Sequence, residues 1–428
     1  MNNPDKPVRF LSLVTLGIGS MVGAGIFALM GEAAALSGPA IWIAFIVAGC
    51  IALLTGHSYV SLGVHYPTRG GTVEYIRRAY GTGLFSGGCS VISYISQIIG
   101  MAMISLAFGK YAAILIGIDH NLPLWERVLG SGLILGLSLV ALIGAGFIAR
   151  LQTTVVIINL LLLAGFTVAL ADYLEPARLS FDTWPAGTPV LGSLALTYFA
   201  YSGFSVLGNT SDRMSNPARQ MPRAMYTTIG IVMVLYVGLA LTITGVVSEQ
   251  ELVSSEAMLL PIAARSIFGE IGFTILLISA VLSAAACLNG GLFGVTNISF
   301  TLAQHGQLPP RFENKIGAST RGLTISAMLA MIMMNFMSLV TIALVGSATI
   351  LLIDLLVNYG ALKLVGGTGL KRLLTTLSVF ASLGTLIIWV IYTLKHAPHT
   401  FTIFATFVVL SFLAEYLIQH RFGGKQSS

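Results

Sequence analysis

The sequence predicts an all-α integral membrane protein with twelve transmembrane helices. Three observations predict this class: 56% of the 428 residues are hydrophobic, only 9% are charged, and long apolar windows recur along the chain. A helix that crosses a bilayer needs about 20 mostly apolar residues. The windows fall at residues 10–30, 39–64, 84–115, 125–147, 150–172, 190–210, 223–247, 270–303, 322–344, 346–365, 373–394 and 399–419.

The predicted spans form one membrane domain, 1–428, because the connections between them are mostly short. Two halves are expected at about 10–172 and 190–365, with the helices at about 373–419 peripheral to them. The N-terminus is too short and polar for a cleaved signal. Segment 209–223 is expected to form a capped turn, because Pro217 and Pro222 forbid a continuous helix through it.

The distribution of Lys and Arg predicts that both termini lie in the cytoplasm. If the spans alternate from an inner N-terminus, most of the 22 basic residues fall inside, and the outer side holds Lys110, Arg127, Arg178, Arg265 and Lys395. Cytoplasmic loops carry this excess in membrane proteins. We therefore expect a multi-pass protein of the cytoplasmic (inner) membrane. The net charge of +6 reflects topology and indicates no nucleic-acid partner.

Glycines interrupt two of the predicted spans. The first span contains GIGSMVGAGIF, with Gly23 and Gly25, and the sixth contains YFAYSGFSVLG around Gly203. An interrupted helix leaves backbone N–H and C=O groups that hydrocarbon cannot satisfy, so it is expected where it lines a polar cavity. The two spans are five spans apart, an odd number, which gives the halves opposite orientations. Such inverted repeats with broken helices 1 and 6 are typical of secondary transporters.

The two interruptions offer opposite partial charges. The half-helix that begins at residues 24–26 presents free N–H groups and a positive dipole end, which suit a carboxylate. The half-helix that ends at residues 199–202 presents free carbonyls, which suit an ammonium group. Together they predict a receptor for a zwitterion. The alternative is that the small residues only allow a close helix–helix contact.

Four motifs in order resemble the amino acid–polyamine–organocation (APC) superfamily of amino acid permeases. They are GSMVGAGIF; YPTRGG with YIRRAYG; FAYSGF with Asn216-Pro217 and Pro222-Arg223-Ala224; and HGQLP at residues 305–309. The resemblance covers nearly the whole chain. It implies a LeuT-like fold with a five-plus-five inverted repeat, and amino acid transport by alternating access.

The resemblance also implies the substrate site. The backbone of Gly23, Ala24 and Gly25 would bind the carboxylate, and the backbone of Phe199, Ala200 and Ser202 the amine. Phe199, Tyr201 and Phe204 would gate or line the site. Gln97 and Met101 of the third span share a helical face and are expected to face the substrate, although Gln97 could equally bond another helix. The full predicted set is Met21, Val22, Gly23, Ala24, Gly25, Ile26, Gln97, Met101, Phe199, Ala200, Tyr201, Ser202, Gly203 and Phe204.

The coupling devices of the superfamily are not evident in this chain. Proton-coupled relatives carry a lysine in span 5, where the matching residue here is Asn159. Sodium-coupled proteins of the fold use a Ser/Thr pair in span 8, where Ser283 is followed by alanines. Asn159 could instead tie spans 1 and 8 together by hydrogen bonds.

Asp354 is the stronger coupling candidate, because a carboxylate within a membrane span costs several kcal/mol and is functional by default. The alternative is a structural aspartate bonded by Tyr359, Asn358 or another helix. His57 in the second span is a lesser candidate, since a lone membrane histidine more often bonds a neighbouring helix.

The sequence therefore predicts a secondary transporter of small neutral L-amino acids, with proton symport expected. The alternatives are an amino acid exchanger, or a permease for polyamines or other organocations. The chain shows no metal-ligand spacing among Cys50, Cys89 and Cys287, no catalytic cluster and no phosphate loop. We expect no enzyme activity, no cofactor and no metal, and expect an amino acid, the bilayer and protons as partners.

Overall fold

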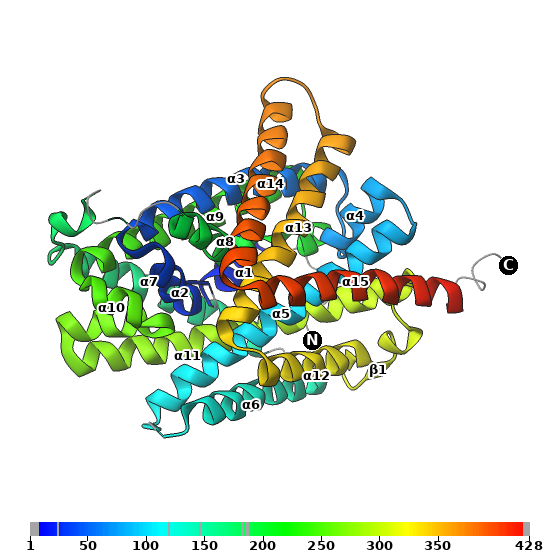
Figure 1. The fold of residues 1–428 in the computed structure, drawn as a ribbon. Helices are drawn as coiled ribbons and strands as arrows, with labels where there is room; N and C mark the ends of the chain where they lie inside the picture. Colours follow the sequence, from blue (N-terminus) through cyan, green and yellow to red (C-terminus); the bar gives the residue numbers. More distant parts are fainter. Residues whose placement is uncertain are drawn as a thin grey trace.

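The computed structural model describes residues 8–23, 25–118, 120–144, 147–180, 184 and 188–422. Ala24, one of the predicted site residues, lies outside them. The described chain is almost entirely helical (Figure 1). In chain order the elements are α1 (Phe10–Val22), α2 (Gly25–Ser37), η1 (Gly38–Ala40), α3 (Ile41–His65), α4 (Thr72–Tyr80), α5 (Leu84–Leu115), α6 (Leu122–Ile143), α7 (Phe147–Ala171), η2 (Pro176–Leu179), α8 (Thr188–Tyr201), η4 (Ser202–Arg213), α9 (Pro217–Val246), α10 (Glu249–Ser254), η5 (Glu256–Met258), α11 (Leu259–Gln304), η6 (Pro310–Phe312), β1 (Lys315–Ile316), β2 (Ser319–Thr320), α12 (Arg321–Phe336), α13 (Leu339–Val365), α14 (Leu370–His396) and α15 (Pro398–Phe422).

Ten helices in the described residues are long and apolar enough to cross a membrane. The first of them, Phe10–His65, is a single run that contains α1, α2 and α3. The apolar helix α12 has 16 residues and falls below that length class. The structure thus confirms an all-helical, multi-pass protein, and the count of twelve crossings stays a prediction.

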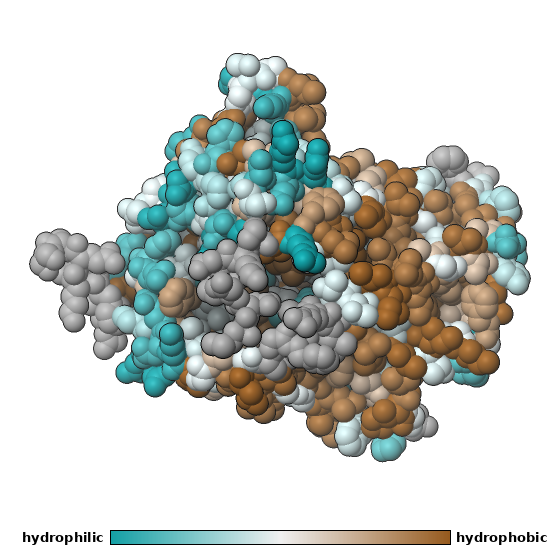
Figure 2. All heavy atoms as spheres, turned by 180° about the vertical axis from the view of Figure 1, so that it is seen from behind, coloured by the Kyte–Doolittle hydropathy of each residue, from teal (hydrophilic) through white to brown (hydrophobic). Residues whose placement is uncertain are grey.

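Large apolar side chains cover much of the outer surface. Figure 2 shows them as a broad brown area over one side of the molecule. Val168, Val234 and Ile271 are among them, each more than 70% exposed. A soluble protein rarely exposes a continuous apolar surface of this size. Lipid contact explains it, because apolar side chains in a bilayer need no burial.

One predicted helix boundary is wrong. The windows 322–344 and 346–365 placed a break at Gly346, but α12 ends at Phe336 and α13 begins at Leu339. Ser338 is the reason, since its backbone is extended and its hydroxyl accepts the N–H of Thr341 as an N-cap. Gly346 remains helical, and there a Cβ atom would lie 2.7 Å from the ring of Phe199.

The prediction that Pro217 and Pro222 forbid a continuous helix through residues 209–223 is confirmed at Pro217 and wrong at Pro222, because η4 ends at Arg213 and a separate helix, α9, begins at Pro217. Helix α9 begins at Pro217 and continues through Pro222 to Val246. Pro217 occupies the first turn, where an N–H has no intrahelical partner, and the side chain of Asn216 caps the start by accepting the N–H of Arg219. Pro222 forfeits one internal hydrogen bond, and the helix tolerates this near its end.

The two interruptions occur where the glycines predict them, but they differ in form. The first separates α1, which ends at Val22, from α2, which begins at Gly25. At the second, α8 ends at Tyr201 and the chain continues as the 3₁₀ helix η4 without an unwound turn. A 3₁₀ run of 12 residues is unusually long, because its hydrogen bonds are poorer than those of an α-helix.

The interrupted helices lie at the centre of the molecule. Helix α1 packs against η4, α7, α9 and α11, and α2 packs against α8. Helices α5, α6, α11 and α12 pack beside one another, and α15 packs along α5 towards the C-terminus (Figure 1). Helix α14 packs on α3 and α13. The two helix interruptions, where regular α-helical hydrogen bonding ends, are therefore surrounded by uninterrupted helices.

Candidate functional site

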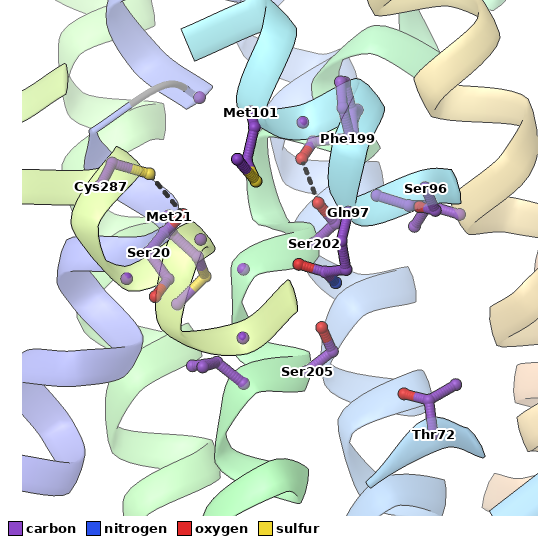
Figure 3. A pocket seen from close by; sticks show the side chains of 18 of the residues that line it. Ser20, Met21, Thr72, Ser96, Gln97, Met101, Phe199, Ser202, Ser205 and Cys287 are labelled. Atoms are coloured by element: carbon purple, nitrogen blue, oxygen red, sulfur yellow. Dashed lines mark hydrogen bonds between the residues drawn. The ribbon is translucent and has the colours of Figure 1, made fainter. Parts of the chain in front are cut away.

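A cavity of about 120 Å³ opens between the two interrupted helices, α5, α11 and α13 (Figure 3). Its lining contains many of the predicted site residues together with one coupling candidate, Asp354. The predicted residues that line it are Met21, Gly25, Gln97, Met101, Phe199, Ala200, Ser202 and Gly203. Residues more than 300 positions apart in sequence therefore meet at one place.

The two interruptions touch each other directly. A Cβ atom on Gly25 would lie 2.5 Å from the carbonyl oxygen of Ala200, and one on Gly203 would lie 2.5 Å from the carbonyl of Ser20. Distances this short leave no room for a side chain, so glycine is required for the close approach. The N-terminus of α2 and the carbonyl end of α8 are thereby brought together at the cavity.

Gly23 packs the other side of the first interruption against α11. A Cβ atom there would lie 2.2 Å from the Cβ of Cys287 and 2.7 Å from the carbonyl oxygen of Ser283. Cys287 also lines the cavity, and its thiol lies 3.5 Å from the carbonyl of Ser20. Ser283 thus meets the interruption through its backbone.

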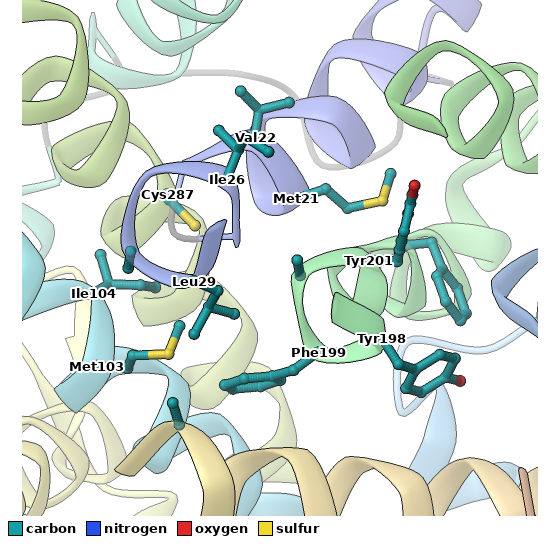
Figure 4. Close-up of a cluster of buried hydrophobic side chains, with 14 of the residues drawn as sticks. Met21, Val22, Ile26, Leu29, Met103, Ile104, Tyr198, Phe199, Tyr201 and Cys287 are labelled. Carbon is teal, nitrogen blue, oxygen red and sulfur yellow. The ribbon is translucent and has the colours of Figure 1, made fainter. Parts of the chain in front are cut away.

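Four predicted site residues, Val22, Ile26, Tyr201 and Phe204, are absent from the cavity lining, as is Gly23. Val22 and Ile26 lie on the side of Cys287, away from the lining residue Phe199, which points towards Leu29 and Met103 (Figure 4). The hydroxyl of Tyr201 donates to the carbonyl of Phe45 on α3, 3.1 Å away. The ring of Phe204 packs edge-on against Tyr59, with centroids 5.6 Å apart. In all of these the backbone is near the cavity, while the side chains pack against neighbouring helices.

Helix α5 contributes a polar wall that the sequence predicted only in part. Gln97 and Met101 line the cavity, and in Figure 3 the amide of Gln97 lies between Ser202 and Ser205. Ser93 and Ser96 line it too and were missed, although their spacing from Gln97 and Gly100 already places them near one helical face. The hydroxyl-rich lining makes the cavity more polar than the sequence suggested.

Asp354 lies at one end of the cavity and is 2% exposed. Its carboxylate accepts hydrogen bonds from the hydroxyls of Tyr59, at 2.9 Å, and Tyr198, at 2.6 Å. Of the partners that the sequence offered, these donors on α3 and α8 confirm another helix and not Tyr359 or Asn358. Tyr359 is half exposed, and Asn358 donates to Thr55 and Ser382 instead.

Within the described chain, Asp354 is the one Asp, Glu, Lys or Arg that lines the cavity. The two tyrosine hydroxyls are neutral, so they stabilise a carboxylate there without cancelling its charge. A proton or another cation would neutralise the negative charge of this buried carboxylate.

The other coupling candidates lie away from the cavity. Asn159 accepts a hydrogen bond from Ser279 of α11, so it ties α7 to span 8 but makes no bond to span 1 that the structure shows. The residue of α7 that contacts α1 is Val156, whose methyl group would lie 2.6 Å from a Cβ on Gly19. His57 pairs through Nδ1 with the hydroxyl of Tyr226 on α9, 2.8 Å away.

Helix α4 also borders the cavity, where Thr72 and Asn209 belong to the lining, and the hydroxyl of Thr72 lies 3.3 Å from the hydroxyl of Tyr59 that donates to Asp354. The loop before α4 is tied to η4 by the reciprocal hydrogen bonds between the backbone of Thr68 and the hydroxyl of Ser211. Arg69 adds an ion pair with Asp212, at 2.5 Å.

Glu74 of α4 pairs with Arg77 and Arg78. Burial alone would raise the pKa of the Glu74 carboxyl, but the two guanidinium groups bring it below its ordinary value. Glu74 is therefore ionised at neutral pH and holds two cations at this face.

Comparisons with known proteins show the family of this chain. The sequence profile of the family described as "Amino acid permease" matches residues 8–415. The chain belongs to the amino acid permease family. It is 33% identical over 364 residues to the inner membrane transport protein YbaT of Escherichia coli, covering 85% of each chain. It is 29% identical to the serine/threonine exchanger SteT of Bacillus subtilis, covering 72% of this chain and 70% of SteT.

A solved structure shows the same fold. The crystal structure of MhsT in complex with L-phenylalanine superposes with a TM-score of 0.67 and covers 91% of this chain and 99% of MhsT, at 13% identity. This amino acid permease therefore has a LeuT-like fold. Its family and these relatives are transporters and not enzymes, and family membership implies an amino acid substrate.

Proposed function

We propose that this amino acid permease is a secondary active transporter that moves small neutral L-amino acids across the cytoplasmic membrane by alternating access. The observation that carries the proposal is the direct contact of the two helix interruptions at one cavity. There the N–H groups of the first turn of α2 and the carbonyls of the last turn of α8 face a space of about 120 Å³, and the carbonyl of Phe199 also accepts the hydroxyl of Ser202. A zwitterion satisfies both sets of groups and brings no net charge.

Each predicted residue has a place in this proposal. The backbone from Gly23 to Ile26 receives the carboxylate, and the carbonyls of Phe199 and Ala200 receive the ammonium group. Gln97 and Met101 face the substrate side chain, and the ring of Phe199 forms a gate. Tyr201 and Phe204 act behind the site, where they hold α8 and η4 against α3.

The architecture of the proposal is twelve crossings with cytoplasmic termini. The halves at about 10–172 and 190–365 form an inverted repeat, and α14 and α15 are peripheral. The bundle of α1, α2, α3, α8, η4 and α9 rocks against α5, α6, α11 and α12. The two groups of helices contact each other around the cavity, as rocking about the substrate site requires.

Proton coupling is assigned to Asp354. It lies at the cavity, whereas Asn159, Ser283 and His57 do not line it, and the polar groups of Asn159 and His57 pair with Ser279 and Tyr226. Val156 places a methyl group where α7 meets Gly19 of α1, so the proposal assigns no coupling ion to that contact. Exchange is the second candidate, because a relative of this chain is named a serine/threonine exchanger.

Uptake into proteoliposomes tests the proposal. A mixture of labelled L-amino acids is presented with and without an inward proton gradient, and then to vesicles preloaded with unlabelled amino acids. We expect gradient-driven accumulation by the wild type. Asp354→Asn should lose the accumulation but retain counterflow, because it keeps the shape of the side chain and one oxygen to accept a tyrosine hydroxyl, and it cannot carry a proton. Glu415→Gln is the matched control, since Glu415 is 1% exposed on α15 and lies outside the cavity lining.

Other outcomes have definite meanings. Uptake that ignores the gradient and requires internal amino acid would establish exchange and remove Asp354 from coupling. No uptake of any amino acid by folded protein would overturn the substrate class.

A further inference from the structure

The two tyrosines that donate to Asp354 lead to different surroundings. Tyr59 donates to Oδ1 at 2.9 Å, and Tyr198 donates to Oδ2 at 2.6 Å. Tyr59 lines the cavity together with Asp354, whereas Tyr198 does not belong to the lining. The hydroxyl of Tyr59 also lies 3.3 Å from that of Thr72. The hydroxyl of Tyr198 lies 3.4 Å from that of Thr55. The two oxygens of one carboxylate therefore begin two separate chains of hydroxyl groups.

The chain through Thr55 ends among buried groups. The Thr55 hydroxyl accepts the side-chain N–H of Asn358 at 3.2 Å, and the same amide donates to Ser382 at 2.8 Å. These three residues are fully buried where α3, α13 and α14 pack together. The group of Asn358 that faces Thr55 is an N–H, which accepts no proton, so no proton passes from Thr55 along this chain. This side anchors the carboxylate.

The chain through Thr72 ends at the cavity. Thr72 is the first residue of α4, and its side chain is among those that line the cavity (Figure 3). A threonine hydroxyl can accept a hydrogen from Tyr59 and donate its own hydrogen in turn. Asn209 of η4 lines the cavity too, and its amide oxygen lies against Gly71, the residue before Thr72. That oxygen is buried and has no hydrogen-bond partner in the part of the chain that the structure describes, so this end of the lining offers a further acceptor.

The ring of Tyr59 is fixed between the two ends of this chain. It packs edge-on against Tyr75 and Phe204, with centroids 6.1 and 5.6 Å apart, and is 1% exposed. The hydroxyl is therefore held between Asp354 and Thr72 by packing, and no large motion is needed to connect them.

We propose that Tyr59 and Thr72 form a relay through which the proton of Asp354 exchanges with water in the cavity on the side of α4. The inference rests on the proposed function, in which Asp354 carries the coupling proton. When Asp354 is protonated, its O–H donates to the oxygen of Tyr59, Tyr59 donates to Thr72, and Thr72 donates to a water molecule.

Release of the proton moves one hydrogen along each of these bonds. The O–H bond of the acid breaks as a new one forms on Tyr59, the former hydrogen of Tyr59 passes to Thr72, and that of Thr72 passes to water. The acid becomes a carboxylate, the two hydroxyls stay neutral, and the water becomes hydronium. Tyr59 then donates to the carboxylate, which is the arrangement in the structure. In the proposed topology α4 follows a cytoplasmic loop, so the relay delivers the proton inwards.

The charged groups of α4 do not compete for this role. Glu74 is paired with Arg77 and Arg78, and none of the three belongs to the cavity lining. Proton transfer from Asp354 thus depends on the neutral hydroxyls between it and the cavity.

Thr72→Val tests the relay, because valine keeps the shape of threonine and removes its hydroxyl. The measurement is the rate at which a mixture of L-alanine, L-serine, L-threonine and L-valine drives proton uptake into proteoliposomes, followed with a trapped pH-sensitive dye. We expect this rate to fall about tenfold or more, since a positioned proton-transfer group contributes at least that much. Thr72→Ser restores the hydroxyl and should restore proton uptake.

Thr55→Val is the matched control. It makes the same change beside the other tyrosine that donates to Asp354, in the chain that ends among buried groups. Proton uptake should be unchanged. Counterflow of the same amino acids at equal pH on both sides needs no net proton transfer, so it should be normal in every variant. A merely structural defect would lower counterflow and proton uptake together.

Normal proton uptake by Thr72→Val would overturn the inference, as would an equal loss in Thr72→Val and Thr55→Val. A parallel loss of counterflow and proton uptake in Thr72→Val would overturn it too. Wild-type protein that takes up amino acids without protons would instead overturn the assignment of proton coupling to Asp354, and the relay with it. The two failures are distinguishable, because the first appears in the variants and the second in the wild type.

Discussion

At the residue scale, the proposed site depends on glycines, which have no side chain. Gly25 and Gly203 each lie within van der Waals distance of the opposite helix interruption, and no other residue type fits there. In the proposed site the substrate therefore meets backbone groups, which cannot be replaced by mutation. Asp354 adds a buried carboxylate bonded by Tyr59 at the cavity, and the hydroxyl of Tyr236 donates to the carbonyl of Met21 at the first interruption.

Gly203→Ala tests this close approach. The added methyl group would overlap the backbone of Ser20 and Met21, so the two interruptions must separate. We expect a loss of about 1–3 kcal/mol in the free energy of unfolding, as for overpacked cores, and a large fall in amino acid uptake. Gly100→Ala is the control, because Gly100 lines the same cavity and a Cβ there meets no atom within 4 Å. Equal behaviour of the two variants in thermal unfolding and uptake would contradict the close approach.

At the element scale, α4 joins segments that are far apart in sequence. It follows a loop bonded to η4, and its charged residues approach the end of α11 at His305. The motifs at residues 66–81 and 305–309 and the end of η4 at residues 209–213 thus form one structural unit beside the cavity. The length of the 3₁₀ helix η4 places its end beside this unit.

His305 makes the stability of this unit depend on pH. Burial lowers the pKa of the imidazole below its ordinary value of 6.5, the nearby Arg77 lowers it further, and Glu74 partly opposes this. Because the folded protein resists protonation, its stability is complete above pH 6.5 and declines as the pH falls through the lowered pKa.

We therefore expect the unfolding temperature in detergent to fall between about pH 6.5 and pH 5, and to fall less in His305→Gln. His65→Gln serves as the control, since His65 is exposed and bonds the carbonyl of Ser61 within its own helix. An identical pH profile for His305→Gln and the wild type would exclude this group as the cause.

At the scale of the whole molecule, an apolar surface surrounds a polar centre. The cavity, Asp354 and the two interruptions are enclosed by helices whose outer faces suit lipid (Figure 2). Helix α12 is the critical element for topology, because 16 residues extend only about 24 Å, short of the bilayer core of about 30 Å. If α12 does not cross, every later loop changes sides.

Single cysteines test the topology in a chain whose Cys50, Cys89 and Cys287 are replaced by serine. Gln250→Cys and Phe336→Cys should react with an impermeant maleimide added outside intact cells. Lys315→Cys and Thr368→Cys should react only after permeabilisation. All four positions are exposed in the structure, so accessibility should report the side of the membrane. Outside labelling of Thr368→Cys would show that α12 or α13 fails to cross.

Much of the fold was predictable because spans are long and apolar, and most windows match helices of the structure. The errors arose where a single residue sets a boundary. Ser338 ended a helix that hydropathy alone continued, and Pro222 was accommodated by α9. Gly23, Gly25 and Gly203 indicated where the two interrupted helices meet, since glycine allows backbones to approach this closely.

The sequence by itself determined that the chain crosses a membrane many times and that two interrupted helices form its centre, because hydrophobic length and glycine placement are local properties. Only the tertiary structure decided which polar groups meet. Asp354 acquires Tyr59 and Tyr198 as donors from two other helices, Val156 takes the position expected for Asn159, and the hydroxyl of Tyr236 reaches both interruptions. Such pairings depend on helix rotation and packing, which the pattern of residues along one span does not fix.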